Sequence, residues 1–178
     1  MSRQYWVSPL PPLHVADGTA LASSTTLTDA SPSPPIVLPA NLLELGSELE
    51  ISAFGQFSNT GTPTLLLGFY YGGVAGSALA ASSAVTTTTG ATAWPWMLEY
   101  RGVVRSVGTS GSIVGQGVLR LGTALTAFTV RPIPEVAASR TVTIDTTAAK
   151  SITLGAQWGT SSASNTLTVN DISVRVVS

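Results

Sequence analysis

Apolar and polar side chains alternate along much of the chain from residue 48 onward. In residues 48–57 the apolar set falls on one parity and the polar set on the other: Leu49, Ile51, Ala53 and Phe57 against Glu48, Glu50, Ser52 and Gln56. A period of two is typical of a strand with one buried face. Strands are therefore expected there and, with short polar turns between most of them, over residues 21–28, 78–86, 94–107, 112–122, 140–147, 150–159 and 165–177, with one more between 124 and 140. The turn GTSGS, between residues 107 and 113, predicts that the two strands around it form a hairpin.

The stretch Thr64–Tyr71 departs from this alternation because it is apolar on both parities. Leu65, Leu67, Phe69 and Tyr71 would form the core face of a strand, which leaves Leu66 and Tyr70 on the opposite face. A sheet face open to water would leave that second row bare. We expect Leu66 and Tyr70 to be covered by a neighbouring subunit, by proline-rich segments of the same chain or by a larger assembly.

These elements predict an all-β fold: a jelly-roll or Greek-key β-sandwich of about eight to ten antiparallel strands. The only helical pattern is ANLLELGSEL, residues 40–49, which Gly46 is expected to end after about two turns. Residues 1–16 are predicted to form an extended N-terminal arm, since Pro9, Pro11 and Pro12 exclude a helix. Residues 17–178 are then a single sandwich domain.

Composition narrows the function classes. The chain has 178 residues, a net charge of -1, 10% charged residues and no cysteine, which excludes disulfides and thiolate metal sites. It lacks the basic stripe of a nucleic-acid-binding protein. Its apolar runs are interrupted every few residues by Gly, Pro, Ser or Thr, so no membrane-spanning helix is expected.

Candidate chemistry is sparse. His14 is the single histidine and lies in the proline-rich arm, where a surface position is expected and a catalytic role is not. Gly115 and Gly117 lack the third glycine of a dinucleotide-binding loop, and a close approach of other groups explains them better. Glu48 and Glu50 share one face of a strand, about 7 Å apart, which is compatible with a glycosidase pair. An exposed acidic face is the commoner explanation, so no catalytic residue, metal or cofactor is expected.

Aromatic residues offer the better candidates for contacts with partners. Tyr5 and Trp6 lie near the tip of the arm, and an arm so rich in proline is unsuited to a core. Trp94 and Trp96 flank Pro95 at a strand start and are expected either to anchor a protein interface or to close one end of the core. With Leu66 and Tyr70, these residues make up the predicted partner-binding set.

Three segments resemble a group of small β-sandwich proteins among the structural proteins of tailed bacteriophages. They are ADGTALASSTTLTD (16–29), LPANLLELGSELEISAFGQFSNTGTPTLLLGFYYGG (38–73) and DTTAAKSITLGAQWGTSSASNTLTVNDISVRV (145–176). The resemblance implies a jelly-roll-like fold and a capsid decoration or cement protein, often a homotrimer, that binds the major capsid protein. It also implies assembly in the host cytoplasm and a final place on the capsid exterior.

Two other hypotheses stay open at this point. One is a receptor- or carbohydrate-binding module of a tail or fibre, which would use the loops of residues 86–96. The other is a glycan hydrolase with Glu48 and Glu50 as its carboxylates.

Overall fold

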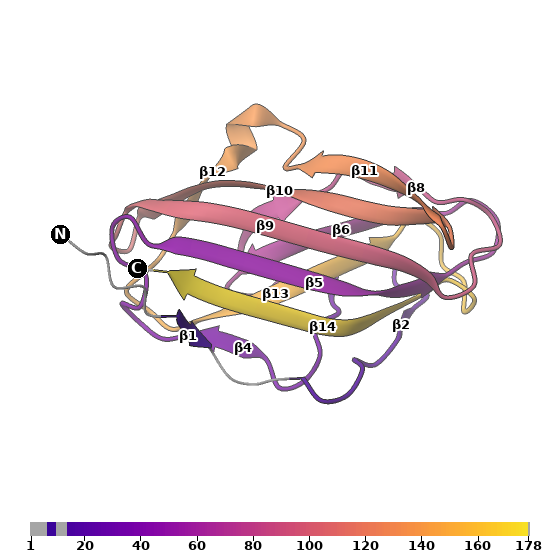
Figure 1. Cartoon of the computed structure of the whole chain (residues 1–178), viewed down its shortest axis with the longest axis horizontal. Coiled ribbons are helices and arrows are strands. Elements are labelled where there is room, and N and C mark those ends of the chain that lie inside the picture. Colours follow the sequence, from indigo (N-terminus) through magenta and orange to yellow (C-terminus); the bar gives the residue numbers. More distant parts are fainter. Residues whose placement is uncertain (1–6, 10–13, 178) are drawn as a thin grey trace.

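The computed structural model describes residues 7–9 and 14–177, and it is a two-layer β-sandwich (Figure 1). The larger layer, sheet A, contains in spatial order β1 (Val7–Pro9), β14 (Thr166–Val177), β5 (Glu48–Ser58), β9 (Trp94–Ser106), β10 (Gly111–Ala124) and β11 (Ala127–Ile133). Two short strands complete it: β2 (Leu21–Ala22) pairs with β14, and β12 (Thr141–Ile144) pairs with β10.

The second layer, sheet B, is built around β13 (Lys150–Trp158) and β6 (Thr64–Tyr71). One edge of β13 pairs with β3 (Thr28–Asp29) and β4 (Ile36–Leu38), and the free side of β6 pairs with β7 (Ser77–Ala81) and β8 (Val85–Thr86). All strand pairs in the described residues are antiparallel. The predicted all-β sandwich is confirmed.

The core lies between the two sheets and is made of the parities that the sequence pattern assigned to it. In β5 the side chains of Leu49, Ile51, Ala53 and Phe57 are buried, whereas Ser52 and Gln56 are exposed. Trp96 of β9 and Trp158 of β13 have no exposed area. The ring of Phe57 contacts Trp158 at a centroid distance of 6.5 Å, so the largest side chains of the two sheets meet at one end of the sandwich.

The predictions of the long strands hold, but two of the expected strands are divided. The strand expected over residues 21–28 is instead β2 and β3, which pair in different sheets. The expected hairpin is present, because β9 and β10 pair along their length from Trp96–Leu121 to Ser106–Ser112. The strand expected over residues 78–86 is instead two short strands, β7 and β8. Between them Ser82 turns inward: its backbone N–H donates to the Leu67 carbonyl at 2.9 Å, and its hydroxyl accepts from the Leu67 N–H at 3.2 Å.

The helix predicted over residues 40–49 is wrong, because residues 40–47 form a loop and residues 48–49 begin β5. Its backbone donors bond to other parts of the chain: the Asn41 N–H donates to the Thr146 carbonyl at 2.8 Å, and the Gly46 N–H donates to the Val104 carbonyl at 3.0 Å. Leu43 is buried in the core. Leu42 is partly buried against the same core, so the apolar spacing that suggested a helix reflects a loop that packs two leucines against the core ahead of β5. Among the described residues the only helical element is a 3-10 turn, η1 (Ala137–Arg140).

The second face of β6 is partly covered by the chain itself. Tyr70 points away from the core, yet only 6% of it is exposed. A Cβ added at Gly155 on the neighbouring strand would lie 2.5 Å from Tyr70 Cε2 and 3.1 Å from Leu27 Cδ1. The tyrosine ring and Leu27 therefore lie over the space that the missing side chain of Gly155 leaves open.

The segment before β3 holds this cover in place. The Trp158 N–H donates to the Ser24 carbonyl at 2.8 Å, and Gln157 Nε2 donates to the Thr25 carbonyl at 2.7 Å. Leu66, which pairs with Gln157, is half-buried on the same face. Three possible covers were expected for this row: a neighbouring subunit, the same chain or a larger assembly. Tyr70 is covered by the same chain, through Leu27, which lies just ahead of the proline-rich segment.

We predict that Gly155→Ala lowers the free energy of unfolding by about 1–3 kcal/mol, because the new methyl group overlaps the Tyr70 ring. Introduced into Tyr70→Ala, the same substitution should cost at least about 1 kcal/mol less, since the space is then free. Urea unfolding of the four proteins of this double-mutant cycle measures the difference. Equal costs in both backgrounds would mean that Tyr70 does not occupy the space above Gly155.

Candidate interaction site

The predicted partner-binding residues have different positions in the structure. Tyr5 and Trp6 lie outside the described residues. Trp96 and Tyr70, both members of the predicted partner-binding set, are buried within the chain, so neither offers area to a partner. Trp96 fills the end of the core, the second of the two roles expected for it. Trp94 is half-buried, with its ring edge-on to Phe57 at 6.4 Å, and Leu66 is half-buried on sheet B.

Part of the loop before β9, which the carbohydrate-binding hypothesis uses, is held by contacts within the chain. Asn59 is buried, and its side-chain Nδ2 donates to Thr87 Oγ1 at 2.5 Å and to the Thr88 carbonyl at 3.0 Å. Thr87 Oγ1 donates in turn to the Pro63 carbonyl at 2.7 Å. These polar groups stabilise the loop and are not free to bind a sugar.

The most prominent candidate surface is an apolar row on the outer face of sheet A. Phe54 on β5 pairs with Met97 on β9, Met97 pairs with Arg120 on β10, and Arg120 pairs with Val130 on β11. Phe54, Met97 and Val130 are 47%, 38% and 59% exposed, and Phe128 on the same face of β11 is 41% exposed. We call Phe54, Met97, Phe128 and Val130 the apolar row.

Arg120 lies between Met97 and Val130 on this face, and its charge is neutralised within the chain. Arg120 Nη1 lies 2.8 Å from Glu99 Oε2, so the guanidinium forms an ion pair with the next row of the sheet. The sequence prediction missed this surface. Its signal was present, because Phe54 and Met97 stand at positions where the alternation of β5 and β9 calls for polar side chains.

A charged zone adjoins the apolar row on the same face. Arg175, Glu50, Arg101 and Gln116 stand side by side on β14, β5, β9 and β10. With Glu99 they line a shallow hollow of about 480 Å³. Arg175 has no ion-pair partner among the described residues.

The acidic pair considered for glycoside hydrolysis lies in this zone. The Arg101 guanidinium contacts the Glu48 carboxylate, and Arg101 Nε lies 3.7 Å from Glu50 Oε1. The hydrogen bond to Glu48 raises the pKa of Arg101 above its ordinary value. A glycosidase needs one carboxyl group that stays protonated until it donates its proton. On this open face the carboxylates of Glu48 and Glu50 both lie beside the Arg101 guanidinium. This arrangement is typical of a cross-strand ion pair.

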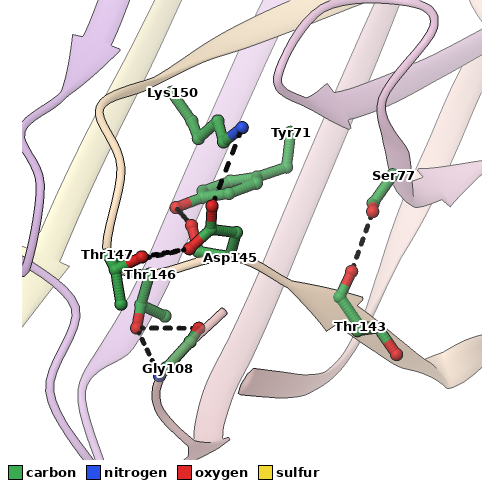
Figure 2. A network of polar contacts seen from close by, with 8 residues as sticks. All are labelled: Tyr71, Ser77, Gly108, Thr143, Asp145, Thr146, Thr147 and Lys150. Carbon is green, nitrogen blue, oxygen red and sulfur yellow. Dashed lines mark hydrogen bonds and ion pairs between the residues drawn. The ribbon is translucent and has the colours of Figure 1, made fainter. Parts of the chain in front are cut away.

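A network of polar contacts joins the two sheets at one end of the sandwich (Figure 2). The Tyr71 hydroxyl, from β6, donates to the Asp145 carbonyl at 2.9 Å, just after β12. Thr146 bonds to Gly108 in the β9–β10 turn: its N–H donates to the Gly108 carbonyl at 3.0 Å, and its Oγ1 accepts from the Gly108 N–H at 2.9 Å. The network thus ties the turn after β12 to both layers.

Asp145 holds the shape of this turn through its carboxylate. Its Oδ1 accepts from Thr147 Oγ1 at 2.7 Å and from the Thr147 N–H at 3.0 Å, and its Oδ2 lies 4.0 Å from Lys150 Nζ. These hydrogen bonds lower the pKa of Asp145, with a smaller contribution from Lys150. The arrangement is that of a structural turn, and Figure 2 shows its side chains facing one another.

His14 is buried, contrary to the surface position expected for it. Its side chain is 1% exposed, Nε2 donates to the Pro34 carbonyl at 3.1 Å, and Nδ1 lies 3.7 Å from Asp171 Oδ1. It therefore links the start of the described body to the proline-rich loop and to β14. This contact fastens the chain where the arm joins the sandwich.

Gly115 and Gly117, considered for a phosphate loop, lie inside β10. The Tyr100 ring and hydroxyl occupy the space beside Gly115, and the hydroxyl also meets Gly102. The hydroxyl is buried and has no hydrogen-bond partner among the described residues. Gly115 therefore allows the close approach that was expected, and the group that approaches it is the ring of Tyr100.

Two other kinds of site are absent from the described chain. None of its His, Asp or Glu side chains form a group of three or more that could hold a metal ion. The part of the chain that the structure describes has no helix with the length and apolar character needed to cross a bilayer.

Comparison with known proteins found no matching family model, no matching curated sequence and no matching solved structure.

We predict opposite effects of removing the hydroxyl groups of two buried tyrosines. Tyr71→Phe should lower the free energy of unfolding by about 1 kcal/mol, because it removes the bond to the Asp145 carbonyl. Tyr100→Phe should raise it by about 1 kcal/mol, because a buried hydroxyl without a partner is lost. Each variant is the control for the other in denaturant unfolding. A loss of stability in Tyr100→Phe equal to that in Tyr71→Phe would contradict the packing described for Tyr100.

Asp145 should make stability depend on pH in the acid range. A folded pKa below the unfolded value of 3.8 means that its contribution is fully present above pH 3.8 and is lost as the pH falls through the folded pKa. Asp145→Asn should therefore melt at a lower temperature than the unmodified chain at pH 7, and the difference should shrink below pH 3.8. Thr147→Val, which removes one donor to the carboxylate, should weaken the same acid dependence. A constant difference between pH 7 and pH 2.5 would contradict this account.

Proposed function

We propose that the chain is a non-enzymatic structural protein of a tailed-bacteriophage virion. It acts as a decoration or cement protein on the capsid exterior, where it self-associates and binds the lattice of the major capsid protein. The observation that carries the proposal is the apolar row on the outer face of sheet A. Surfaces of this kind are typical of protein–protein contacts.

Three further features support a structural role. The first is the resemblance to phage virion proteins, which implies a place on the capsid exterior; it covers residues 16–29, 38–73 and 145–176. The acidic pair Glu48 and Glu50 contacts Arg101 on an open face, which favours a surface ion pair over catalysis. The sandwich is also held by packing without cysteine, as suits a protein that folds in a reducing cytoplasm and then functions outside the cell.

The N-terminal arm is attached to the sandwich by specific contacts at the edge of sheet A. β1 pairs with β14 at the edge of sheet A, with Val7 opposite Val177 and Pro9 opposite Arg175. His14 fastens the next described residues through Pro34 and Asp171. We propose that Tyr5 and Trp6 contact the capsid from this edge.

A second candidate function is a receptor- or carbohydrate-binding module of a tail or fibre. The hollow in the charged zone favours it, because Glu50, Gln116 and Arg175 offer carboxylate, amide and guanidinium groups to a polar ligand. The ring of Tyr100 points into the core, so none of the described residues that line the hollow offers a ring platform for a sugar. Binding on a glycan array, lost in Arg175→Ala, would favour this function over decoration of the capsid.

Deleting residues 1–16 should weaken binding to capsids of the major capsid protein from the same genome by at least about tenfold, which corresponds to about 1.4 kcal/mol. The double substitution Tyr5→Ser, Trp6→Ser keeps β1 and His14 and should weaken binding in the same direction. Cosedimentation with purified capsids measures both, and urea unfolding checks that each variant is folded. Undiminished binding by the deletion variant would rule out docking through the arm.

A further inference from the structure

The free edge of sheet A coincides with the end of the apolar row. β11 is the last strand of the sheet, and within the described chain its ladder partner is β10 alone (Figure 1). Along β11 the outward positions are Phe128 and Val130, where an exposed edge strand usually carries charged or polar residues. An uncovered edge with apolar side chains is a template for pairing with another strand.

The other sheet edges are shorter, polar or already covered. At the opposite edge of sheet A, β1 and β2 have three and two residues. Between them residues 168–174 of β14 lack a described strand partner on that side, but the outward positions there include the polar Thr168 and Ser173. In sheet B, β7 lies beside β12, and the Ser77 hydroxyl donates to the Thr143 carbonyl at 2.8 Å, a contact drawn in Figure 2. Among the described strands, β11 therefore offers the longest apolar edge for association.

We propose that β11 pairs antiparallel with β11 of a second copy of this chain, about a twofold axis at Thr129. This inference deepens the self-association in the proposed function and rests on that part of it. In this register Phe128 of each copy stands opposite Val130 of the other. Aromatic and β-branched residues form favourable cross-strand pairs.

The pairing also joins the apolar rows of the two copies. The line Phe54, Met97, Arg120, Val130 on one copy continues into Phe128 of the second copy, and the symmetry repeats the contact in reverse. Sheet A then becomes one continuous sheet across both copies. Pro132 has no N–H to donate, so it limits the paired segment to about residues 127–131.

The charges on this edge are suited to a partner of the same sequence. Arg120 is paired with Glu99 at 2.8 Å, and Arg131 Nη1 lies 3.4 Å from Glu135 Oε1. Both cations near the axis are thus neutralised inside their own chain. Two identical edges can approach without like-charge repulsion, and neither presents a net charge that would favour an oppositely charged partner.

The first test is a cross-link at the axis. The chain has no cysteine, so Thr129→Cys introduces a single thiol. Directly opposed residues in antiparallel strands have Cα atoms about 4.5–5.5 Å apart, within the disulfide range of about 4.4–6.8 Å. Mild oxidation of the full chain should give a covalent dimer. Val37→Cys, at a 47% exposed position on β4 of sheet B, is the control and should stay monomeric on a denaturing gel.

The second test measures association without a cross-link. Val130→Lys places a charge at the contact and should weaken dimerisation at least tenfold in sedimentation equilibrium. Val37→Lys makes the same change at a similarly exposed valine and should leave dimerisation unchanged. Urea unfolding confirms that both variants fold.

The possible outcomes separate this inference from the proposed function. A dimer lost in Val130→Lys supports the inference even where purified capsids do not bind the chain. A monomer at tens of micromolar, or the trimer implied by the resemblance with no sensitivity to Val130→Lys, overturns it. Loss of capsid binding in Val130→Lys by a monomeric chain also overturns it, because the apolar row would then contact the capsid.

Discussion

The sandwich depends on the fit between large aromatic rings and glycines on neighbouring strands. Tyr70 lies over Gly155 on the outside of sheet B, and Tyr100 lies against Gly115 in the core. Trp96 packs above Gly55, where an added Cβ would lie 2.9 Å from Cζ2 of the indole. In each case the ring occupies space that any side chain on the partner strand would fill. The rings therefore pack close to the backbone, and they help to determine which strands can lie side by side.

Packing of this kind matters because the chain has few other means of stabilisation. It contains no cysteine, and only 10% of its residues are charged. The polar network at the end of the sandwich adds specific bonds between the layers, through Tyr71 to Asp145 and through Thr146 to Gly108. Exposed ion pairs such as Arg101 with Glu48 contribute little by comparison. The stability of the fold thus rests mainly on apolar burial and on a few buried polar contacts.

Alternation of side chains predicted the long strands and the core face of each, because that pattern follows directly from strand geometry. The helical spacing of residues 40–49 gave a wrong prediction, because the positions of Thr146 and Val104 decide which groups accept the backbone hydrogen bonds of this loop. Alternation also left open what covers Tyr70 and whether Trp96 closes the core or anchors an interface. Trp96 and Tyr70 are aromatic residues within strands. The pattern of one strand does not distinguish a buried ring from an exposed one, because that depends on packing against other strands. The arrangement of the candidate site depends on the same long-range register, which aligns Phe54, Met97 and Val130.

The two outer faces of the sandwich illustrate opposite solutions for an apolar row that points away from the core. On sheet B the segment before β3 bonds along β13, and its Leu27 helps to cover Tyr70. On sheet A the apolar row of β5, β9 and β11 stays exposed in the described chain, although the outward positions next to it on β5 carry Ser52 and Glu50. A chain with so little charge gains little solubility from ionic groups, so this exposed row has a larger effect than it would on a highly charged surface. The covered row therefore contributes to the stability of the fold, whereas the exposed row is the surface for which we propose contacts with a partner.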